Sequence, residues 1–202
     1  NTFLTDHAGP LGLTIGTVQI SDKSSVEAAI ADYDVLSTAE QASLVNEKAL
    51  LDDLLLKIGV LEETLVFKTD HAGPLSLTTE SVQVSDKTAV EAALAAYDLL
   101  SAEAQAELTV EKALLDSLLA EIQNQEEANQ FKIDHSIVLA LTPATVEISN
   151  KVAVEAALAA YDVLSTEVQN ELTNEKALLD SLLAEIQNQE AAETFRTNYA
   201  SE

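Results

Sequence analysis

Hydrophobic residues in the middle of the chain recur at the spacing of an amphipathic helix. After Lys87 they fall at i, i+3, i+4 and i+7, while charged residues fall on or near the other face. The apolar stripe consists of Val90, Ala93, Leu94, Tyr97 and Leu100. The pattern predicts a helix from Lys87 to about Leu100, with Ser85 or Asp86 capping its free N–H groups.

Two more helices follow along the chain. Ser101 can cap the first of them, and Leu108 is its apolar anchor. The strong helix formers EKALLDSLLAEIQ come next, and a hitch near Thr109-Val110 predicts a division into a short helix and a long one. The stripe expected to face the core consists of Ala113, Leu115, Leu118, Leu119 and Ile122.

The segment 67–85 allows two interpretations. Phe67, His71 and Leu75 lie four positions apart, which fits a helix that continues from the preceding residues. The pair Gly73-Pro74 should kink or stop that helix. The first interpretation is therefore a helix followed by an irregular loop.

The second interpretation is a short β-hairpin. Residues 75–77 and 82–84 alternate with a period of two around a polar TTES turn. We favour the helix and loop, because the third equivalent stretch, FKIDHSIVLALT, has no helix breaker before Pro143. An isolated two-stranded hairpin is also only marginally stable.

The whole pattern occurs three times. Aromatic and histidine residues repeat every 64 positions: Phe3, Phe67, Phe131 and Phe195; Tyr33, Tyr97 and Tyr161; His7, His71 and His135. We therefore divide the chain into copy one (1–66), copy two (67–130) and copy three (131–194), with 195–202 as the start of a fourth copy. Copy one is the most divergent: it reads KIGVLEETLV where the others read EIQNQEEANQ and EIQNQEAAET.

A fixed period in this range indicates stacked supersecondary units that lean on their neighbours. Three amphipathic helices per copy predict an all-α fold. We expect a tandem array of small three-helix bundles, a spectrin-like rod, in which long shared helices can join neighbouring copies. At ~1.5 Å per residue and roughly 20 residues per pass, each copy would advance such a rod by about 30 Å.

The charge balance narrows the range of partners. Thirty-five acidic residues face ten Lys and Arg, for a formal charge of −25, which repels nucleic acids and anionic membranes and disfavours self-association. We expect a monomer whose partners are the neighbouring repeats of the same chain. The most apolar region, 50–66, is interrupted by charged residues, so no membrane insertion is expected. There is no Cys, which excludes disulfides and thiolate metal sites.

The string D-K-x-x-V-E-A-A-[IL]-x-x-Y-D-x-L-S-x-E-x-Q-x-x-L stands at 86–108, with close copies at 22–44 and 150–172. It resembles the Ala-rich three-helix tandem repeats of Gram-positive bacterial cell-surface and S-layer-associated proteins, over about half of the chain. The resemblance implies an extracellular, wall-attached protein whose modules serve as stalk or spacer, or as adhesive modules. The chain departs from the family pattern at FxxDHAGP. A chain that starts at Asn1 without Met is expected to be a mature product or a fragment of a larger secreted protein.

The Asp-His pairs are the most site-like feature: Asp6-His7, Asp70-His71 and Asp134-His135. As a functional site they would be metal ligands or acid–base groups. Adjacent residues on a helix point about 100° apart, however, and no copy has a second His. We therefore interpret each His as a helix-end residue whose ring packs on Phe and Leu, with its charge near the C-terminal helix dipole.

No other motif indicates chemistry. The tyrosines occupy core positions, and Asp32 and Asp34 are expected on a solvated face, since copies two and three have Ala96 and Ala160 at the position of Asp32. No calcium loop, nucleophile motif or phosphate-binding loop occurs, so we predict no catalytic residue, no metal site, no cofactor and no enzyme activity. Loose binding of divalent cations to the acidic surface stays open.

Two functions remain. The first is a structural stalk or spacer that projects other domains from a bacterial cell wall. The alternative is a multivalent adhesin that binds a host protein or a wall polysaccharide through the segments between helices.

Overall fold

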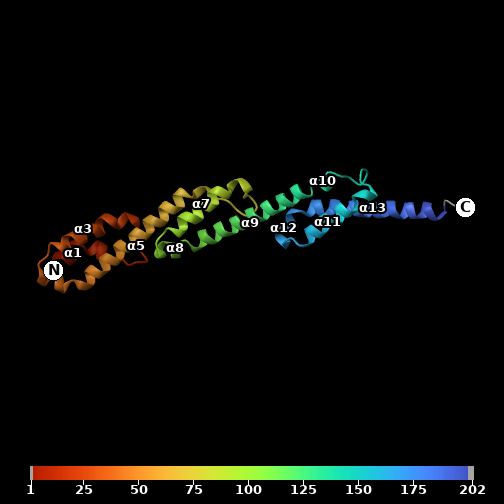
Figure 1. The fold of residues 1–202 in the computed structure, drawn as a ribbon. Coiled ribbons are helices and arrows are strands. Elements are labelled where there is room, and N and C mark those ends of the chain that lie inside the picture. The colour runs from red at the N-terminus through yellow and green to blue at the C-terminus, as the bar shows by residue number, and fades with distance from the viewer. Residues whose placement is uncertain (1, 200–202) are drawn as a thin grey trace. The chain divides into compact units, whose positions relative to one another are not determined.

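The computed structural model describes residues 2–199 and is helical throughout (Figure 1). Within these residues it contains 13 α-helices, three short 3₁₀ helices and no β-strand. The all-α prediction is confirmed. The chain divides into two compact parts. The first compact part holds the residues up to Thr78 and Thr88–Asp116, and the second holds Thr79–Lys87 and the residues from Ser117 onward.

The same order of helices occurs in each copy. Copy one contains α1 (Thr2–Asp6), α2 (Ala8–Leu11), η1 (Ile20–Asp22), α3 (Lys23–Asp34), α4 (Thr38–Ser43) and most of α5 (Val45–Asp70). Copy two adds α6 (Ala72–Leu75), η2 (Val84–Asp86), α7 (Lys87–Asp98), α8 (Ala102–Glu107) and most of α9 (Thr109–Asp134). Copy three adds α10 (Ser136–Leu139), η3 (Ile148–Asn150), α11 (Lys151–Asp162), α12 (Thr166–Glu171) and α13 (Thr173–Tyr199).

The core of copy one lies between α3 and α5, which run side by side. Helix α3 contributes small and β-branched residues and α5 contributes larger ones, so that the two helices approach closely. The buried cluster consists of Phe3, Val18, Val26, Ala29, Leu44, Leu51, Leu54 and Ile58. Each large aliphatic side chain in such a cluster contributes about 1.5–3 kcal/mol to folding.

The core of copy three has the same design in the second compact part. Helix α11 lies along α13, and the buried cluster consists of Val138, Val146, Val154, Ala157, Val168, Leu172, Leu179, Leu182 and Ile186. It also includes Ala128 and Phe131, which belong to α9, the long helix that begins in copy two. Copy three therefore completes its core with side chains from the preceding copy's helix.

Both long helices cross a copy boundary without a break. Helix α5 runs past residue 66 to Asp70, and α9 runs past residue 130 to Asp134. The first aromatic residue of the next copy is then carried on the same helix. Phe67 packs edge-on against Tyr97 with ring centroids 6.2 Å apart, and Phe131 packs on Tyr161 at 6.3 Å.

Helices α5 and α9 end at equivalent positions, Asp70 and Asp134, although Gly-Pro follows only the first. His71 and His135 leave helical geometry with φ near −110° and −106°, and the short helices α6 and α10 begin directly after them. The prediction that Gly73-Pro74 kinks or stops the helix is wrong, because α5 ends at Asp70, before this pair, and α10, which has no Gly or Pro, is just as short as α6. Pro74 lies buried in the first turn of α6, where backbone N–H groups have no helical partner to lose.

The loop after these short helices contains no strand within residues 76–83. The helix-and-loop interpretation is therefore confirmed, and the hairpin is wrong. In copies one and three the loop is closed by threonines instead: the Thr17 hydroxyl accepts a hydrogen bond from the Thr14 N–H at 2.9 Å, and Thr145 does the same for Thr142.

Most other sequence predictions of local structure hold. The Ser101 hydroxyl accepts the Ala104 N–H at 3.2 Å, and Leu108 separates α8 from α9 at the predicted hitch. Asp86, one of the two predicted caps of α7, accepts a hydrogen bond from the N–H of Gln83, which closes the 3₁₀ turn η2. One prediction is wrong. Ala113 is exposed, because it lies about 200° around the helix from the fully buried Leu115.

Candidate binding grooves at the repeat junctions

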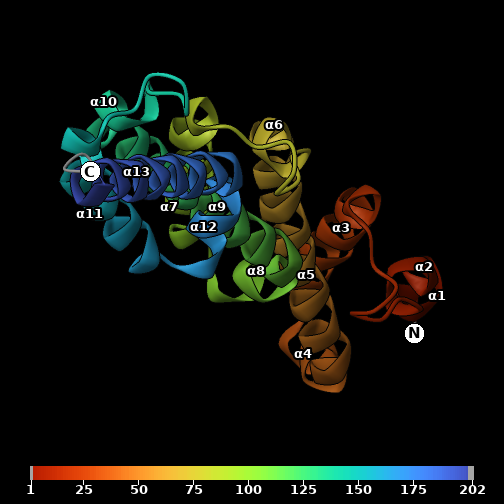
Figure 2. The same cartoon turned by 90° about the vertical axis from the view of Figure 1, so that its right-hand side faces the viewer.

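Hollows in the surface occur where one copy meets the next. Junction one is formed by α5, the residues before and within η1, and α8. Figure 2 shows α8 beside α5. Junction two is the equivalent place one period later: residues 79–85, α9 and the end of α12. Each junction lies within one compact part.

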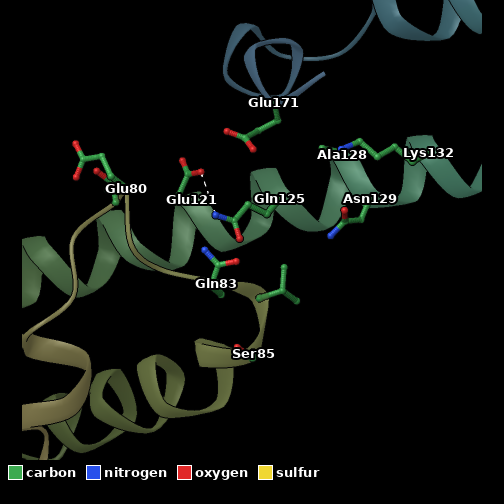
Figure 3. A pocket seen from close by; sticks show the side chains of 11 residues that line it. Glu80, Gln83, Ser85, Glu121, Gln125, Ala128, Asn129, Lys132 and Glu171 are labelled. Carbon is green, nitrogen blue, oxygen red and sulfur yellow. Dashed lines mark hydrogen bonds between the residues drawn. The ribbon is translucent and has the colours of Figure 1, made fainter. Parts of the chain in front are cut away.

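Junction two is a polar cavity of about 530 Å³ (Figure 3). Its polar lining consists of Thr79, Glu80, Gln83, Ser85, Glu121, Gln125, Asn129, Lys132 and Glu171. The Gln125 amide donates hydrogen bonds to the Val82 carbonyl at 3.0 Å and to Glu121 at 3.4 Å, which fixes the loop to the long helix. Lys132 reaches Glu175 at 3.3 Å. Three carboxylates therefore surround the cavity, and its one cation is already paired.

Junction one is lined by apolar side chains at the same places. One groove of about 310 Å³ lies between α5 and α8, with walls and rim formed by Ile15, Asp53, Leu56, Lys57, Val60, Glu103, Ala106 and Glu107. A second hollow beside it includes Val18, Ile20, Leu61 and Leu65. Leu61 and Leu65 replace Gln125 and Asn129 of junction two. The Lys57 ammonium is 2.6 Å from the Glu107 carboxylate, whereas junction two has Glu121 and Glu171 at these positions.

An N-terminal cap also crosses junction one. In copy one, the Glu40 carboxylate accepts hydrogen bonds from both the N–H and the hydroxyl of Ser37, three residues earlier. Copy two has Ala104 where Glu40 stands, and Glu63 of α5 accepts the N–H and hydroxyl of Ser101 instead. These hydrogen bonds lower the pKa of the Glu63 carboxyl, as they lower that of Glu40. Helix α8 is thus capped by the preceding copy.

A further ion pair links α5 to the start of α9. The Lys68 ammonium lies 2.7 Å from Glu111. Burial raises the pKa of the Glu111 carboxyl, but the hydrogen bond and charge of Lys68 outweigh it and the net shift is downward. Lys132 and Glu175 are the same pair one period later. These contacts hold consecutive long helices together.

The Asp-His pairs form no shared site. Each His lies half-buried at the end of a helix with its ring on the preceding Phe (ring centroids of Phe67 and His71 are 5.0 Å apart), which confirms the helix-end interpretation. The neighbouring Asp is exposed in every copy. Copy one adds a contact that sequence reasoning missed: His7 Nε2 is 3.0 Å from Asp32 Oδ2. Ala96 and Ala160, at the position of Asp32 in the other copies, cannot bind the His in this way. The sequence indicated this contact only through the presence of Asp at this position in copy one alone.

The three tyrosines of the period, Tyr33, Tyr97 and Tyr161, pack on the core, as predicted. Each is half-buried against its Phe, and its hydroxyl donates to a main-chain carbonyl, as Tyr97 does to Gln105 at 2.9 Å. The same glutamine returns a hydrogen bond from its amide to the Tyr97 carbonyl at 3.1 Å. These rings are therefore occupied in holding the short helix α8 to α7, and the same pairing occurs in copies one and three.

Among residues 2–199, no group of three or more His, Asp or Glu side chains is arranged to hold a metal ion. Over the same residues, no helix is both long and apolar enough to span a bilayer. No known protein-family model matches the chain, and neither a curated protein nor a solved structure is detectably similar to it.

Proposed function

We propose that this chain is a structural spacer, a run of helical repeats that serves as a stalk for other domains. The observation that carries the proposal is the way each copy uses its neighbour's helix. A long helix begins in the core of one copy, crosses the boundary unbroken and ends with a buried Phe that packs on the next copy's Tyr. A chain built in this way has no flexible linker at the boundary, which suits a spacer.

The polar contacts support the same function. Consecutive long helices are paired by Lys68–Glu111 and Lys132–Glu175. Within each copy, a Lys at the start of the first full helix binds a Glu near the end of the long helix at 2.7–2.9 Å: Lys23–Glu62, Lys87–Glu126 and Lys151–Glu190. The hydrogen bond from the carboxylate raises the pKa of Lys23 and of Lys151. These repeated ion pairs all join one helix to another.

Small-angle scattering tests the spacer proposal. If each copy advances by about 30 Å, the radius of gyration should lie well above the ~17 Å of a compact domain of this length. A value near that of a compact domain would contradict the proposal. The −25 charge is expected to keep the particles monomeric at moderate ionic strength, which the forward-scattering intensity checks in the same experiment.

The cell-surface location is a separate part of the proposal and rests on the resemblance of 22–44, 86–108 and 150–172 to surface-protein repeats. The encoding gene provides the test. We expect it to encode a secretion signal, a wall-attachment region and more 64-residue copies. A gene that encodes none of these would leave the spacer function standing and remove the surface location.

A further inference from the structure

The long helix of copy one presents apolar side chains to solvent at junction one. Leu56 is 64% exposed and Ile15 is 51% exposed. With Ala106, and with the buried Val60 (7% exposed) at the floor, they line the groove between α5 and α8. Contiguous exposed apolar surface of this kind commonly marks an interaction site.

The other copies show that the fold does not require these apolar residues. Copy two has Thr79, Ala120 and Asn124 at the positions of Ile15, Leu56 and Val60, and copy three has Pro143, Ala184 and Asn188. Helix α9 nevertheless has 26 residues, the same length as α5, α13 has 27, and the inward residues of both are fully buried. The exposed Ile15 and Leu56 of copy one therefore contribute something other than the fold.

The rim of the groove is acidic. Asp53 lies on the α5 side, and Glu103 and Glu107 lie on α8. The single rim cation, Lys57, is paired with Glu107. An apolar floor with uncompensated carboxylates at its edge favours a ligand that has apolar groups on one side and cationic groups next to them. The net charge of −25 attracts such a cationic ligand from a distance.

The dimensions of the groove fit a short helix. Its α5 wall runs from Asp53 through Leu56 to Val60, about two helical turns or ~10 Å. A partner helix can bind such a groove by inserting two apolar side chains that are spaced i, i+3 or i, i+4 in its sequence. A volume of about 310 Å³ is at the lower end for small-molecule pockets, so a few side chains can fill it.

We propose that the groove of Ile15, Leu56, Val60 and Ala106 binds a basic amphipathic helix of a partner protein. Two aliphatic side chains of that helix enter the groove, and its Lys or Arg residues bind Asp53 and Glu103. Anionic lipid is disfavoured as the occupant because the rim repels it. The apolar groove occurs at junction one and not at junction two, so it differs from a multivalent adhesin, and it does not depend on the spacer function.

The test uses the full chain and a defined probe. A fluorescein-labelled 14-residue peptide made only of Leu and Lys, with its leucines on one helical face, is titrated with the chain near 0.15 M salt, where distant charges are screened. A peptide with Glu in place of Lys, phosphatidylglycerol vesicles and an apolar dye form the other arms. We expect one peptide to bind per chain. The methyl NMR signals of Ile15, Leu56 and Val60 should shift, while those of the exposed Leu99 and Val163 should not.

Substitutions with the residues of copy two provide the decisive variants. Ile15→Thr with Leu56→Ala keeps every charge and changes two mostly exposed side chains, so the chain should still fold, and we expect binding to weaken about tenfold. Leu65→Asn with Val66→Gln, outside this groove, should leave binding unchanged. Equal binding by the groove variant, equal binding of the Glu peptide, or binding of only vesicles or dye would each overturn the proposal.

Discussion

The two junctions are formed by equivalent elements of the repeat, but the side chains that line them are mainly apolar at junction one and polar at junction two. At junction one the long helix presents Leu61 and Leu65 where junction two has Gln125 and Asn129. Lys57 binds Glu107 at the first, while the second has two glutamates at these positions. The central buried positions of the long helix, by contrast, repeat: Leu51, Leu54 and Ile58 of α5 correspond to Leu115, Leu118 and Ile122 of α9. The repeat therefore separates two tasks: inward residues of the long helix specify the fold, and outward residues near its end are free to differ in function.

The largest expected effect tests what the junctions share. Phe67→Ala and Phe131→Ala should each destabilise the chain by about 3–5 kcal/mol, because each removes a buried ring from the next copy's core. Chemical denaturation followed by circular dichroism measures this.

The fourth phenylalanine is the matched control. Phe195 has the same place in the period but is 64% exposed, so Phe195→Ala should change stability by less than about 0.5 kcal/mol. If Phe67→Ala, Phe131→Ala and Phe195→Ala reduced the free energy of unfolding equally, burial of the ring in the next copy's core would not be what holds the copies together.

The next effect tests helix continuity at the boundary. Val66→Pro should cost about 3 kcal/mol or more, since proline removes a helical hydrogen bond in the interior of α5. Val66 is 59% exposed, and Val66→Gln introduces the residue of copy two at this position, so this control should be nearly neutral. Near-native stability of the Val66→Pro variant would mean that the copies are connected at this boundary by a flexible linker and not by a continuous helix.

The third prediction concerns the cap that copy two takes from copy one. Ser101→Ala should cost about 1 kcal/mol through loss of the N-cap of α8. Glu63→Ala should lower the melting temperature at pH 7. The folded pKa of Glu63 is below its ordinary value, so its contribution is present above about pH 4.5 and is lost as the pH falls through the lowered folded pKa.

The melting temperatures of the wild-type chain and Glu63→Ala should therefore converge only as the pH falls below the ordinary Glu pKa of about 4.3. Glu40→Ala is the parallel variant, because Glu40 makes the same bonds to Ser37 inside copy one. A difference between wild type and Glu63→Ala that stays constant with pH would exclude a role for the Glu63 charge.

The smallest effect exchanges the charges of the two junctions. Glu121→Lys should stabilise junction two by about 0.2–1 kcal/mol by creating the ion pair that Lys57 makes in junction one, and Lys57→Glu should destabilise junction one by a similar amount. Both effects should shrink in 1 M salt. An unchanged stability of the Glu121→Lys variant would mean that residues 121 and 171 are too far apart to interact.

The sequence predicted the features that follow from periodicity. The buried Leu115, Leu118 and Ile122 repeat at helical spacing, and Ser101 precedes its helix as a cap should, so both were predicted correctly. The end of the long helix was misattributed to Gly-Pro, because local propensity is a weaker determinant than the packing of the repeated Phe and His.

Contacts between copies could not be predicted. The cap from Glu63 to Ser101 and the pair Lys57–Glu107 join residues 38 and 50 positions apart, and no local pattern indicates them. The groove of copy one was visible only as divergence of the stretch KIGVLEETLV. The structure explains this divergence, because Leu56 and Val60 lie beside α8 and line the groove.

The central claim is that the copies share continuous helices, and amide hydrogen exchange tests it most directly. The amides of residues 64–68 in α5 and 128–132 in α9 flank the copy boundaries and lie inside helices. We predict that they exchange as slowly as those at the helix centres, near Leu54 and Leu118, because opening them requires unfolding of both adjoining cores. Fast exchange confined to the boundary residues would contradict the account and show that the copies fold as separate modules.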